Sequence, residues 1–155
     1  MDREDALLYE NRKFCACGFA FALPDGFLLN TEPMECFPLG FGAWTPGEEK
    51  IYVEWQIEVG CHGTYEELRE LFIDDSGMSP LNHISPIIIN GLSGHHVMYS
   101  DRSGQRYEMR LSSGDGNELS FRVTSEDTDI LTAISTPAIQ AAINGIWPWE
   151  LEANE

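Results

Sequence analysis

Two adjacent histidines, His95 and His96, are the side chains in this sequence best suited to acid–base or metal chemistry. They follow the turn signal GLSG at 91–94 and open an expected strand. Because neighbouring residues of a strand point to opposite faces, their rings cannot ligate one metal ion together from regular β geometry. We therefore expect at most one of them to join a site and interpret both as surface or hydrogen-bonded histidines.

A zinc site is the metal centre that the sequence could assemble, from Cys15, Cys17, Cys61 and His62. Zinc favours four Cys or His ligands in a tetrahedral arrangement, usually supplied in pairs such as Cys-x2-Cys. Here the pairs are Cys-x-Cys and an adjacent Cys-His, separated by a long segment that strand pairing could bring together. Buried, small, apolar cysteines are the favoured alternative.

The turn at 91–94 does not support catalysis or nucleotide binding. It does not match the Gly-x-Ser-x-Gly nucleophile elbow or the glycine-lysine phosphate loop. The oxygen-rich turns at 74–77 and 115–118 do not match the calcium loop of an EF-hand. With no reaction motif in the chain, we expect a protein that is not an enzyme and that carries no cofactor.

The charge of the chain narrows the class of partner. Nine Lys and Arg residues stand against 26 Asp and Glu residues, which gives a formal net charge of −17. Nucleic-acid binding requires a basic face to displace counterions from phosphates, and anionic membranes are disfavoured for the same reason. The acidity predicts either a basic protein partner or simply solubility through self-repulsion.

The expected location is the cytoplasm. The charged start, MDREDALLYENRK, has no apolar core of a secretory signal. No run reaches the ~18 to 20 consecutive apolar residues of a membrane helix. We therefore expect a reducing compartment in which the four cysteines, at positions 15, 17, 36 and 61, are free thiols.

Four aromatic residues lie outside the expected helices and strands and are the candidate interaction residues. Trp147 and Trp149 stand in an expected tail at 147–155, and Phe41 and Trp44 stand in a Pro- and Gly-rich stretch at 30–50. Aromatic side chains are enriched among interface anchors. The alternative is that they cover an edge of the core.

The hydrophobic pattern predicts one domain over 1–155, with a possible N-terminal arm at 1–13. Strict alternation at 51–59 indicates a half-buried antiparallel strand, and the β-branched run at 87–89 indicates a buried one. The other expected strands are 14–23, 95–100, 105–112 and 118–125.

Capping signals place the helices. Thr64 and Glu67 have the spacing of a capping box, so a helix is expected to begin there. Thr136 followed by Pro137 predicts the start of another helix, and Gly145 predicts its end. The order of elements favours the α+β class: a mostly antiparallel central sheet with helices packed on it, similar to an α/β/α sandwich.

Four segments resemble a known family of structures. They are FALPDGF at 21–27, IYVEWQIEV at 51–59, TYEELRE at 64–70 and IIINGLSGHHVMYS at 87–100. The pattern is similar to the fold shared by the extrinsic oxygen-evolving protein of photosystem II and the Ran-binding nuclear import factor, and to small bacterial proteins of this kind. The resemblance implies a central antiparallel sheet between helices and mostly non-catalytic work in binding or assembly. It carries over no site residue.

The sequence thus predicts a non-enzymatic, acidic module that binds a protein partner or assembles with itself. Its expected interaction residues are Trp147, Trp149, Trp44 and Phe41. The alternative is a metal- or small-ligand-binding protein that uses its Cys and His residues. Neither nucleic acid nor a membrane is an expected partner.

Overall fold

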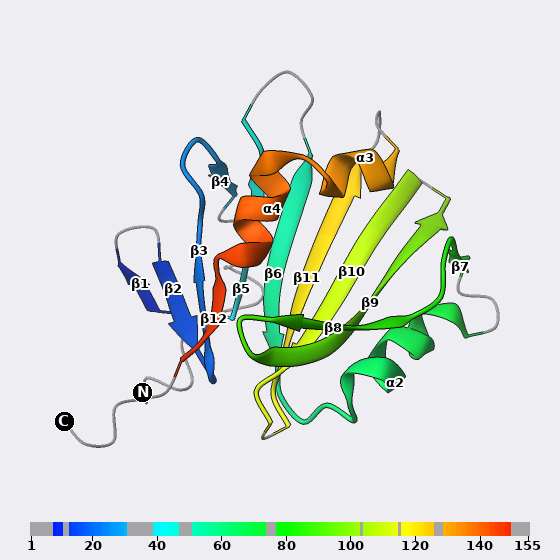
Figure 1. Ribbon diagram of the computed structural model, residues 1–155, viewed down its shortest axis with the longest axis horizontal. Helices are drawn as coiled ribbons and strands as arrows, with labels where there is room; N and C mark the ends of the chain where they lie inside the picture. The colour runs from blue at the N-terminus through cyan, green and yellow to red at the C-terminus, as the bar shows by residue number, and fades with distance from the viewer. Residues whose placement is uncertain are drawn as a thin grey trace.

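The computed structural model describes residues 8–10 (backbone only), 13–30, 39–46, 51–73, 77–102, 104–114, 116–125 and 129–149. Within these ranges the strands form two antiparallel sheets (Figure 1). The smaller sheet has the order β1-β2-β3-β12, formed by Leu8–Glu10, Lys13–Ala16, Phe19–Ala22 and Ile146–Pro148.

The larger, eight-stranded sheet has the order β4-β5-β6-β11-β10-β9-β7, and β8 pairs with β9 outside this path. Its strands are β4 (Leu28–Asn30), β5 (Gly40–Trp44), β6 (Tyr52–Glu58), β7 (Ser79–Pro80), β8 (Ser85–Ile89), β9 (Leu92–Asp101), β10 (Gly104–Ser112) and β11 (Glu118–Ser125). The helices are α2 (Thr64–Arg69), continued by the 3₁₀ turn η2 (Glu70–Phe72), α3 (Ile130–Ile134) and α4 (Pro137–Asn144).

The expected α+β class with antiparallel sheets is confirmed, but the layering is more complex than the expected α/β/α sandwich. The strands at the N-terminus join β12 in a separate sheet instead of extending a single central one. Helices α3 and α4 and the smaller sheet contribute to one core with the large sheet, and α2 packs on β9 and β10 from the other side. None of the helices within the described ranges has the length and hydropathy needed to cross a membrane.

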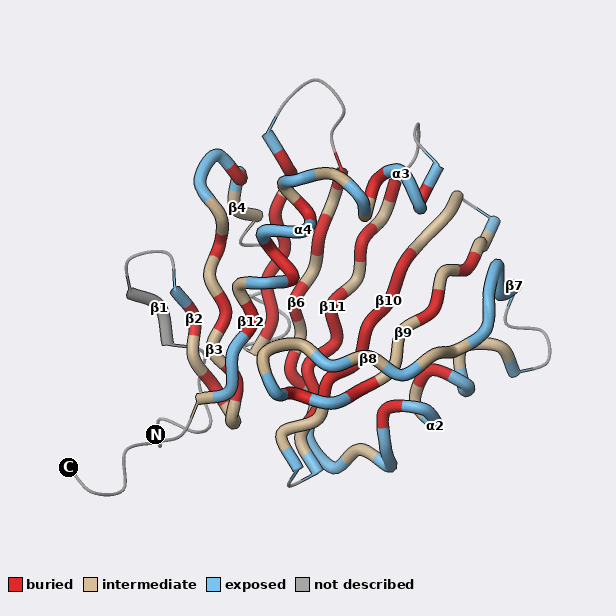
Figure 2. Tube along the Cα trace, in the orientation of Figure 1, coloured by how far each residue is buried: buried red, intermediate tan, exposed pale blue. Residues whose placement is uncertain are grey.

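Alternation along the central strands creates the main core. In β6 the buried residues are Val53, Trp55 and Ile57, which confirms the period-two pattern of the sequence. Figure 2 shows this alternation along β6, whereas β10 and the first half of β11 are buried over consecutive residues.

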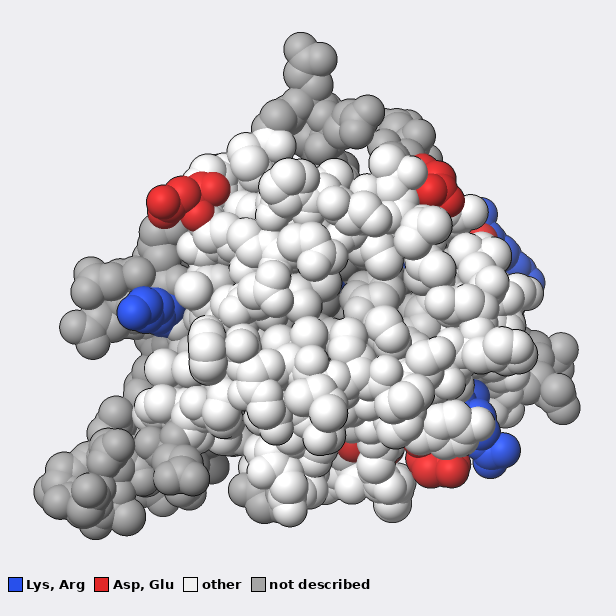
Figure 3. All heavy atoms as spheres, in the orientation of Figure 1, with Lys and Arg blue, Asp and Glu red and all other residues white. Residues whose placement is uncertain are grey.

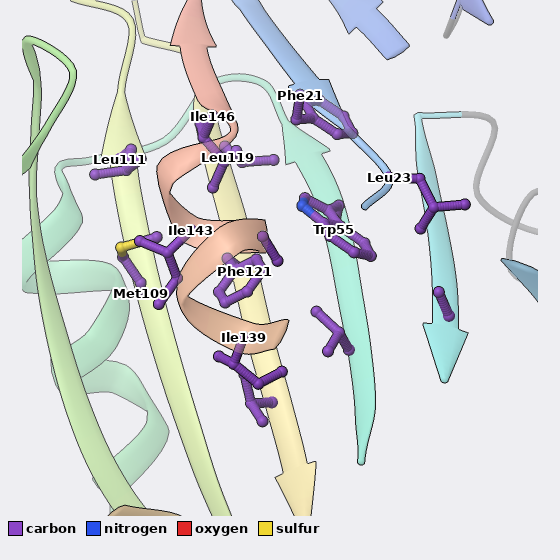
Figure 4. Packing of buried hydrophobic residues seen from close by; sticks show 14 of the residues in the cluster. Phe21, Leu23, Trp55, Met109, Leu111, Leu119, Phe121, Ile139, Ile143 and Ile146 are labelled. Atoms are coloured by element: carbon purple, nitrogen blue, oxygen red, sulfur yellow. The ribbon is translucent and has the colours of Figure 1, made fainter. Parts of the chain in front are cut away.

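Helix α4 closes this core over the large sheet. Its Ile139 and Ile143 lie against Met109 and Phe121 of the sheet (Figure 4). Burial of one such isoleucine contributes about 1.5–3 kcal/mol, so this stripe fixes the helix on the sheet.

A stack of aromatic rings joins the two sheets. Phe14 and Phe21 come from the smaller sheet, and Phe41 and Trp55 come from the larger one. The ring centroids of Phe14 and Phe41 are 3.9 Å apart, and those of Phe41 and Trp55 are 4.7 Å apart. Phe41 is only 1% exposed and lies in β5, where the sequence predicts an irregular loop. It is therefore a core residue and not an interaction residue.

The two helix starts differ in how well the sequence predicts them. At α4 the Thr136 hydroxyl accepts a hydrogen bond from the Ile139 N–H and Pro137 is the first helical residue, as expected. At α2 the expected capping box is wrong, because the N-cap is Gly63 and Thr64 is already helical. The Thr64 hydroxyl instead shares a 2.7 Å hydrogen bond with Nδ1 of His95, a contact across the fold that local spacing cannot reveal.

Strand β8 is an exposed edge and not the buried strand that its three isoleucines predict. Ile88 is 70% exposed, because β8 pairs with β9 alone within the described residues. A two-residue turn joins the strands, with φ of 50° at Asn90 and 89° at Gly91, as the primed hairpin turns require.

The Asn90 side-chain amide donates hydrogen bonds to the carbonyl oxygens of Asn144 (3.0 Å) and Ile146 (2.7 Å). These two hydrogen bonds, which we call the Asn90 tie, connect the hairpin to the end of α4 and to β12.

Parts of the expected arm and tail belong to the smaller sheet. Leu8–Glu10 pairs with β2, and Lys13 is the first residue of β2. Trp147 and Pro148 pair with β3, and the Trp149 N–H donates a 2.8 Å hydrogen bond to the Gly18 carbonyl. The remaining residues of the arm and tail, 1–7, 11–12 and 150–155, lie outside the described residues.

The Asn90 tie predicts a specific order of stabilities. Asn90→Gly keeps the positive φ but removes two hydrogen bonds, and we expect it to lower the free energy of unfolding by about 1–3 kcal/mol. Asn90→Asp should lower it further, because its carboxylate would face two carbonyl oxygens. Urea unfolding followed by tryptophan fluorescence measures both. An Asn90→Gly variant as stable as the wild type would show that the tie contributes nothing.

Candidate functional site

The structure does not assemble the predicted zinc site. Cys15 lies in β2 and Cys17 in the turn after it, whereas Cys61 and His62 lie between β6 and α2. Among the described residues, which include all four, no group of three or more His, Cys, Asp or Glu side chains could hold a metal ion. Cys36 lies outside the described residues.

The adjacent histidines point to opposite faces of β9, as expected. His95 contacts α2 through Thr64 and the ring of Tyr65, whose centroid lies 5.5 Å away. His96 shares a 2.7 Å hydrogen bond with the hydroxyl of Tyr107. Burial, followed by the neighbouring His95, lowers the pKa of His96 below its ordinary value. Both rings are thus engaged in structural contacts.

The predicted tryptophans belong to different sheets. Trp147 is 54% exposed on β12, and Trp149 beside it is half-buried. Trp44 is half-buried in β5 of the larger sheet, with its ring 5.2 Å from that of Tyr52. Of the four predicted interaction residues, Trp147 offers the most accessible apolar surface.

Trp147 belongs to one of two long stretches of the chain that contain no charged residue. The stretches 76–100 and 130–149 contain no Asp, Glu, Lys or Arg, in a chain in which 23% of residues are charged. The first stretch supplies β8, and the second supplies α3, α4 and β12. These elements lie together on the side of the molecule that faces the viewer in Figure 1. Figure 3 shows that the described charged atoms visible from this side lie around its rim.

We call this surface the uncharged face and define it by Pro86, Ile88, Leu131, Gln140, Asn144 and Trp147, all exposed. Ile88, Leu131 and Trp147 are each more than half exposed. The cores of protein interfaces are depleted of charged residues and enriched in aromatic ones, which matches this composition. The sequence shows the two long charge-free stretches, but it does not show that they lie on one face. In the structure the Asn90 tie connects them.

The opposite side of the large sheet carries a buried ion network. Glu108 in β10 is 0% exposed, and its Oε1 accepts hydrogen bonds from Nε (2.9 Å) and Nη2 (2.8 Å) of Arg122. Its Oε2 accepts from Nε of Arg110 at 3.1 Å. Strand register explains the arrangement, because Glu108 and Arg122 are cross-strand partners and Arg110 follows on the same face of β10.

The surroundings of Arg122 and Tyr99 raise the pKa values of both groups. Burial, the largest influence, lowers the pKa of Arg122, but the Glu108 carboxylate and then Tyr99 raise it above the ordinary value. Burial and the Glu108 carboxylate raise the pKa of Tyr99 to about 12. These groups therefore do not exchange protons near neutral pH, and the network is suited to holding the strands together and not to acid–base catalysis.

Three carboxylates meet at the free end of Arg110. Its Nη1 lies 2.9 Å from Glu58, 3.5 Å from Glu118 and 3.8 Å from Glu67, which come from β6, β11 and α2. We call Glu58, Glu67 and Glu118 the acidic cluster. Burial, and then the carboxylates of this cluster, raise the pKa of the nearby Cys61 thiol to about 11. Burial also raises the pKa of Glu118, although Arg110 opposes this.

Comparison with protein-family models gives no match, and comparison with curated proteins gives no significant sequence similarity. Two solved structures are similar in fold. The Ran-binding protein Mog1p of Saccharomyces cerevisiae aligns with a TM-score of 0.52 and 9% identity, over 83% of this chain and 89% of Mog1p. A Bacteroides thetaiotaomicron protein aligns with a TM-score of 0.51 and 10% identity, over 92% of this chain and 50% of that one.

The chain is similar in fold to Mog1p. The expected resemblance to the fold of a Ran-binding import factor is thereby confirmed as a structural likeness. At this level of identity the likeness establishes the fold and transfers no activity, because one fold hosts many functions.

The ion network predicts a large effect of one substitution. Glu108→Gln removes the buried carboxylate that the buried Arg110 and the half-buried Arg122 share, and we expect it to lower the free energy of unfolding by about 3–5 kcal/mol. The control Glu66→Gln removes an exposed partner of Arg69 and should cost less than about 1 kcal/mol. Urea titration compares them, and similar stabilities of the two variants would contradict a structural role for Glu108.

The acidic cluster predicts that the Cys61 thiol is alkylated slowly. In a variant with serine at positions 15, 17 and 36, Cys61 should react slowly with iodoacetamide at pH 8, because the thiolate is the reactive form and its pKa is raised. Adding Glu118→Gln removes a carboxylate that raises this pKa, so alkylation should become several-fold faster. Adding Glu66→Gln should leave the rate unchanged. An equal rate in all three variants would show that the cluster does not act on the thiol.

Proposed function

We propose that this chain is a non-enzymatic protein-binding or assembly module that docks a basic partner protein through the uncharged face. The observation that carries the proposal is the exposure of Ile88, Leu131 and Trp147 on a surface that has no charged side chain among the described residues of β8, α4 and β12, in a chain with a net charge of −17. Exposed apolar side chains on a charge-depleted surface mark interaction sites in soluble proteins.

The charge of the chain selects the kind of partner. Two copies at −17 repel each other at long range, which disfavours self-association as the purpose of the face. A basic protein is attracted by the same field, which raises its association rate. The uncharged face then provides the contact at short range, where apolar burial stabilises the complex without desolvating charged groups.

Trp147 is the proposed anchor of the contact. It is large and amphipathic, and its backbone is fixed in β12 by pairing with β3. Rigid aromatic side chains of this kind dominate binding energy when a partner buries them. The Asn90 tie holds Ile88 beside this segment, so the two contacts form one prearranged surface.

One further observation supports the proposal. Mog1p, which is similar in fold, is named as a Ran-binding protein, so the fold is one on which protein recognition has been built. The partner of Mog1p is not assigned to this chain.

The test compares two double variants, each of which removes two exposed apolar side chains. Ile88→Ser with Trp147→Ser alters the uncharged face, and Leu28→Ser with Val59→Ser alters side chains that are 66% and 64% exposed elsewhere. Each protein is used to capture partners from extracts of the source cell, and the affinity for the captured protein is then measured. Circular dichroism checks that both variants remain folded.

We expect a basic protein that binds the wild type and the Leu28/Val59 control equally and loses at least about tenfold in affinity for the Ile88/Trp147 variant, since two contact residues of about 1 kcal/mol or more are removed. Equal binding by both variants, or loss only in the control, would contradict the docking face. A dimer of the free protein that the Ile88/Trp147 variant abolishes would replace the basic partner with a second copy of the chain.

A further inference from the structure

We propose that the acidic cluster is a binding site for one basic side chain, an ammonium or guanidinium group that the partner protein supplies. The proposal rests on the proposed function in that the partner is basic, but it concerns a different site from the uncharged face. It assigns Glu58, Glu67 and Glu118 the role of receiving that group beside Arg110.

The acidic cluster brings together three carboxylates around the guanidinium group of Arg110. Nη1 of Arg110 is the cation that faces all three cluster carboxylates, at 2.9, 3.5 and 3.8 Å. The other side of the same guanidinium is already engaged, because Nε donates to the buried Glu108. Arg122 is paired with Glu108, so it brings no spare positive charge to the cluster.

Two buried atoms lack a hydrogen-bond partner at this point. Glu118 is only 2% exposed, yet its Oε1 accepts no hydrogen bond from the described residues, and Nη1 of Arg110 donates none. The 3.5 Å separation of these atoms is an ion pair with no hydrogen bond. A buried carboxylate oxygen without a donor is costly, so it is prepared to accept one from a ligand.

The site is open on one side. The Glu58 side chain is 37% exposed and that of Glu67 is 15% exposed, whereas Arg110 beneath them is 8% exposed. A long basic side chain can therefore approach past Glu58, keep its stem at the surface and place its charge beside Glu58 and Glu67, above the buried Oε1 of Glu118. The low-polarity surroundings strengthen this attraction relative to exposed carboxylates such as Glu66 and Glu70.

A basic side chain fits the cluster better than a metal ion. Metal ions require a set of ligands at short, fixed distances, and the described residues provide no such group. Arg110 already stands among the three carboxylates. Ammonium and guanidinium groups carry several donors and tolerate varied geometry, so one can share carboxylates with Arg110.

The test uses hexalysine as the probe and isothermal titration calorimetry of the isolated protein at physiological salt. Glu58→Gln is the main variant because Glu58 is partly exposed and its loss does not threaten folding. Glu118→Gln tests the buried oxygen, and circular dichroism confirms its fold. Glu66→Gln and Glu70→Gln are matched controls that remove one charge each from the neighbouring α2 and η2.

We expect Glu58→Gln and Glu118→Gln each to weaken hexalysine binding about tenfold, the effect of one charge-assisted hydrogen bond, and each control to weaken it less than about twofold. Equal weakening by all four variants would mean that hexalysine senses only net charge and would overturn the proposal. Titration with calcium chloride and zinc chloride completes the test. Saturable binding of either ion that Glu58→Gln abolishes would overturn the preference for a basic side chain.

Failure of this inference is distinguishable from failure of the proposed function. The Ile88/Trp147 variant keeps the acidic cluster, so it should bind hexalysine like the wild type. If Glu58→Gln leaves hexalysine binding intact while the Ile88/Trp147 variant loses the captured partner, the cluster is not a site and the docking face stands. The reverse pattern would remove the docking face and keep the cluster.

Discussion

The carboxylate of Glu108 is the interaction on which the large sheet depends. It is completely buried, and it neutralises guanidinium groups on its own strand and on the next one. Without it, the buried Arg110 and the half-buried Arg122 would lose the carboxylate that they share, which a fold of this size does not tolerate at low cost. The residues between these positions, Met109 and Phe121 among them, face the opposite side and build the apolar core. Strands β10 and β11 thus hold ions on one face and the core on the other.

This division of the sheet organises the surface as well. On the ionic side, α2 is positioned by polar contacts, through Thr64 to His95 and Glu67 to Arg110. On the apolar side, α4 and the β8–β9 hairpin cover the core with residues that carry no charge, and Asn90 joins them. An acidic protein therefore presents two contrasting surfaces: an uncharged one suited to apolar contact and an acidic cluster with an incompletely satisfied carboxylate. Long-range attraction and short-range docking can then be served by different residues.

Regular periodicity is what the sequence predicted well. The alternation at 51–59 and the Thr136–Pro137 start of α4 follow from local rules and are confirmed. Features decided by distant contacts were predicted poorly. The isoleucines of β8 suggest burial but form an edge, and Phe41 lies in a Pro- and Gly-rich stretch yet stacks between the sheets. Among the candidate interaction residues, Phe41 is buried and Trp147 is 54% exposed, a difference that local spacing could not reveal because burial depends on distant contacts.

The most direct test of the docking face is hydrogen–deuterium exchange of the protein alone and in complex with the partner recovered from its source cell. Amide exchange reports which backbone segments a partner covers or stabilises. The account predicts slower exchange in the complex across 85–91 and 137–148, the segments of β8, α4 and β12, with little change in β4 and β5. Protection confined to β4, β5 and β6, with unchanged exchange over 85–91 and 137–148, would contradict it.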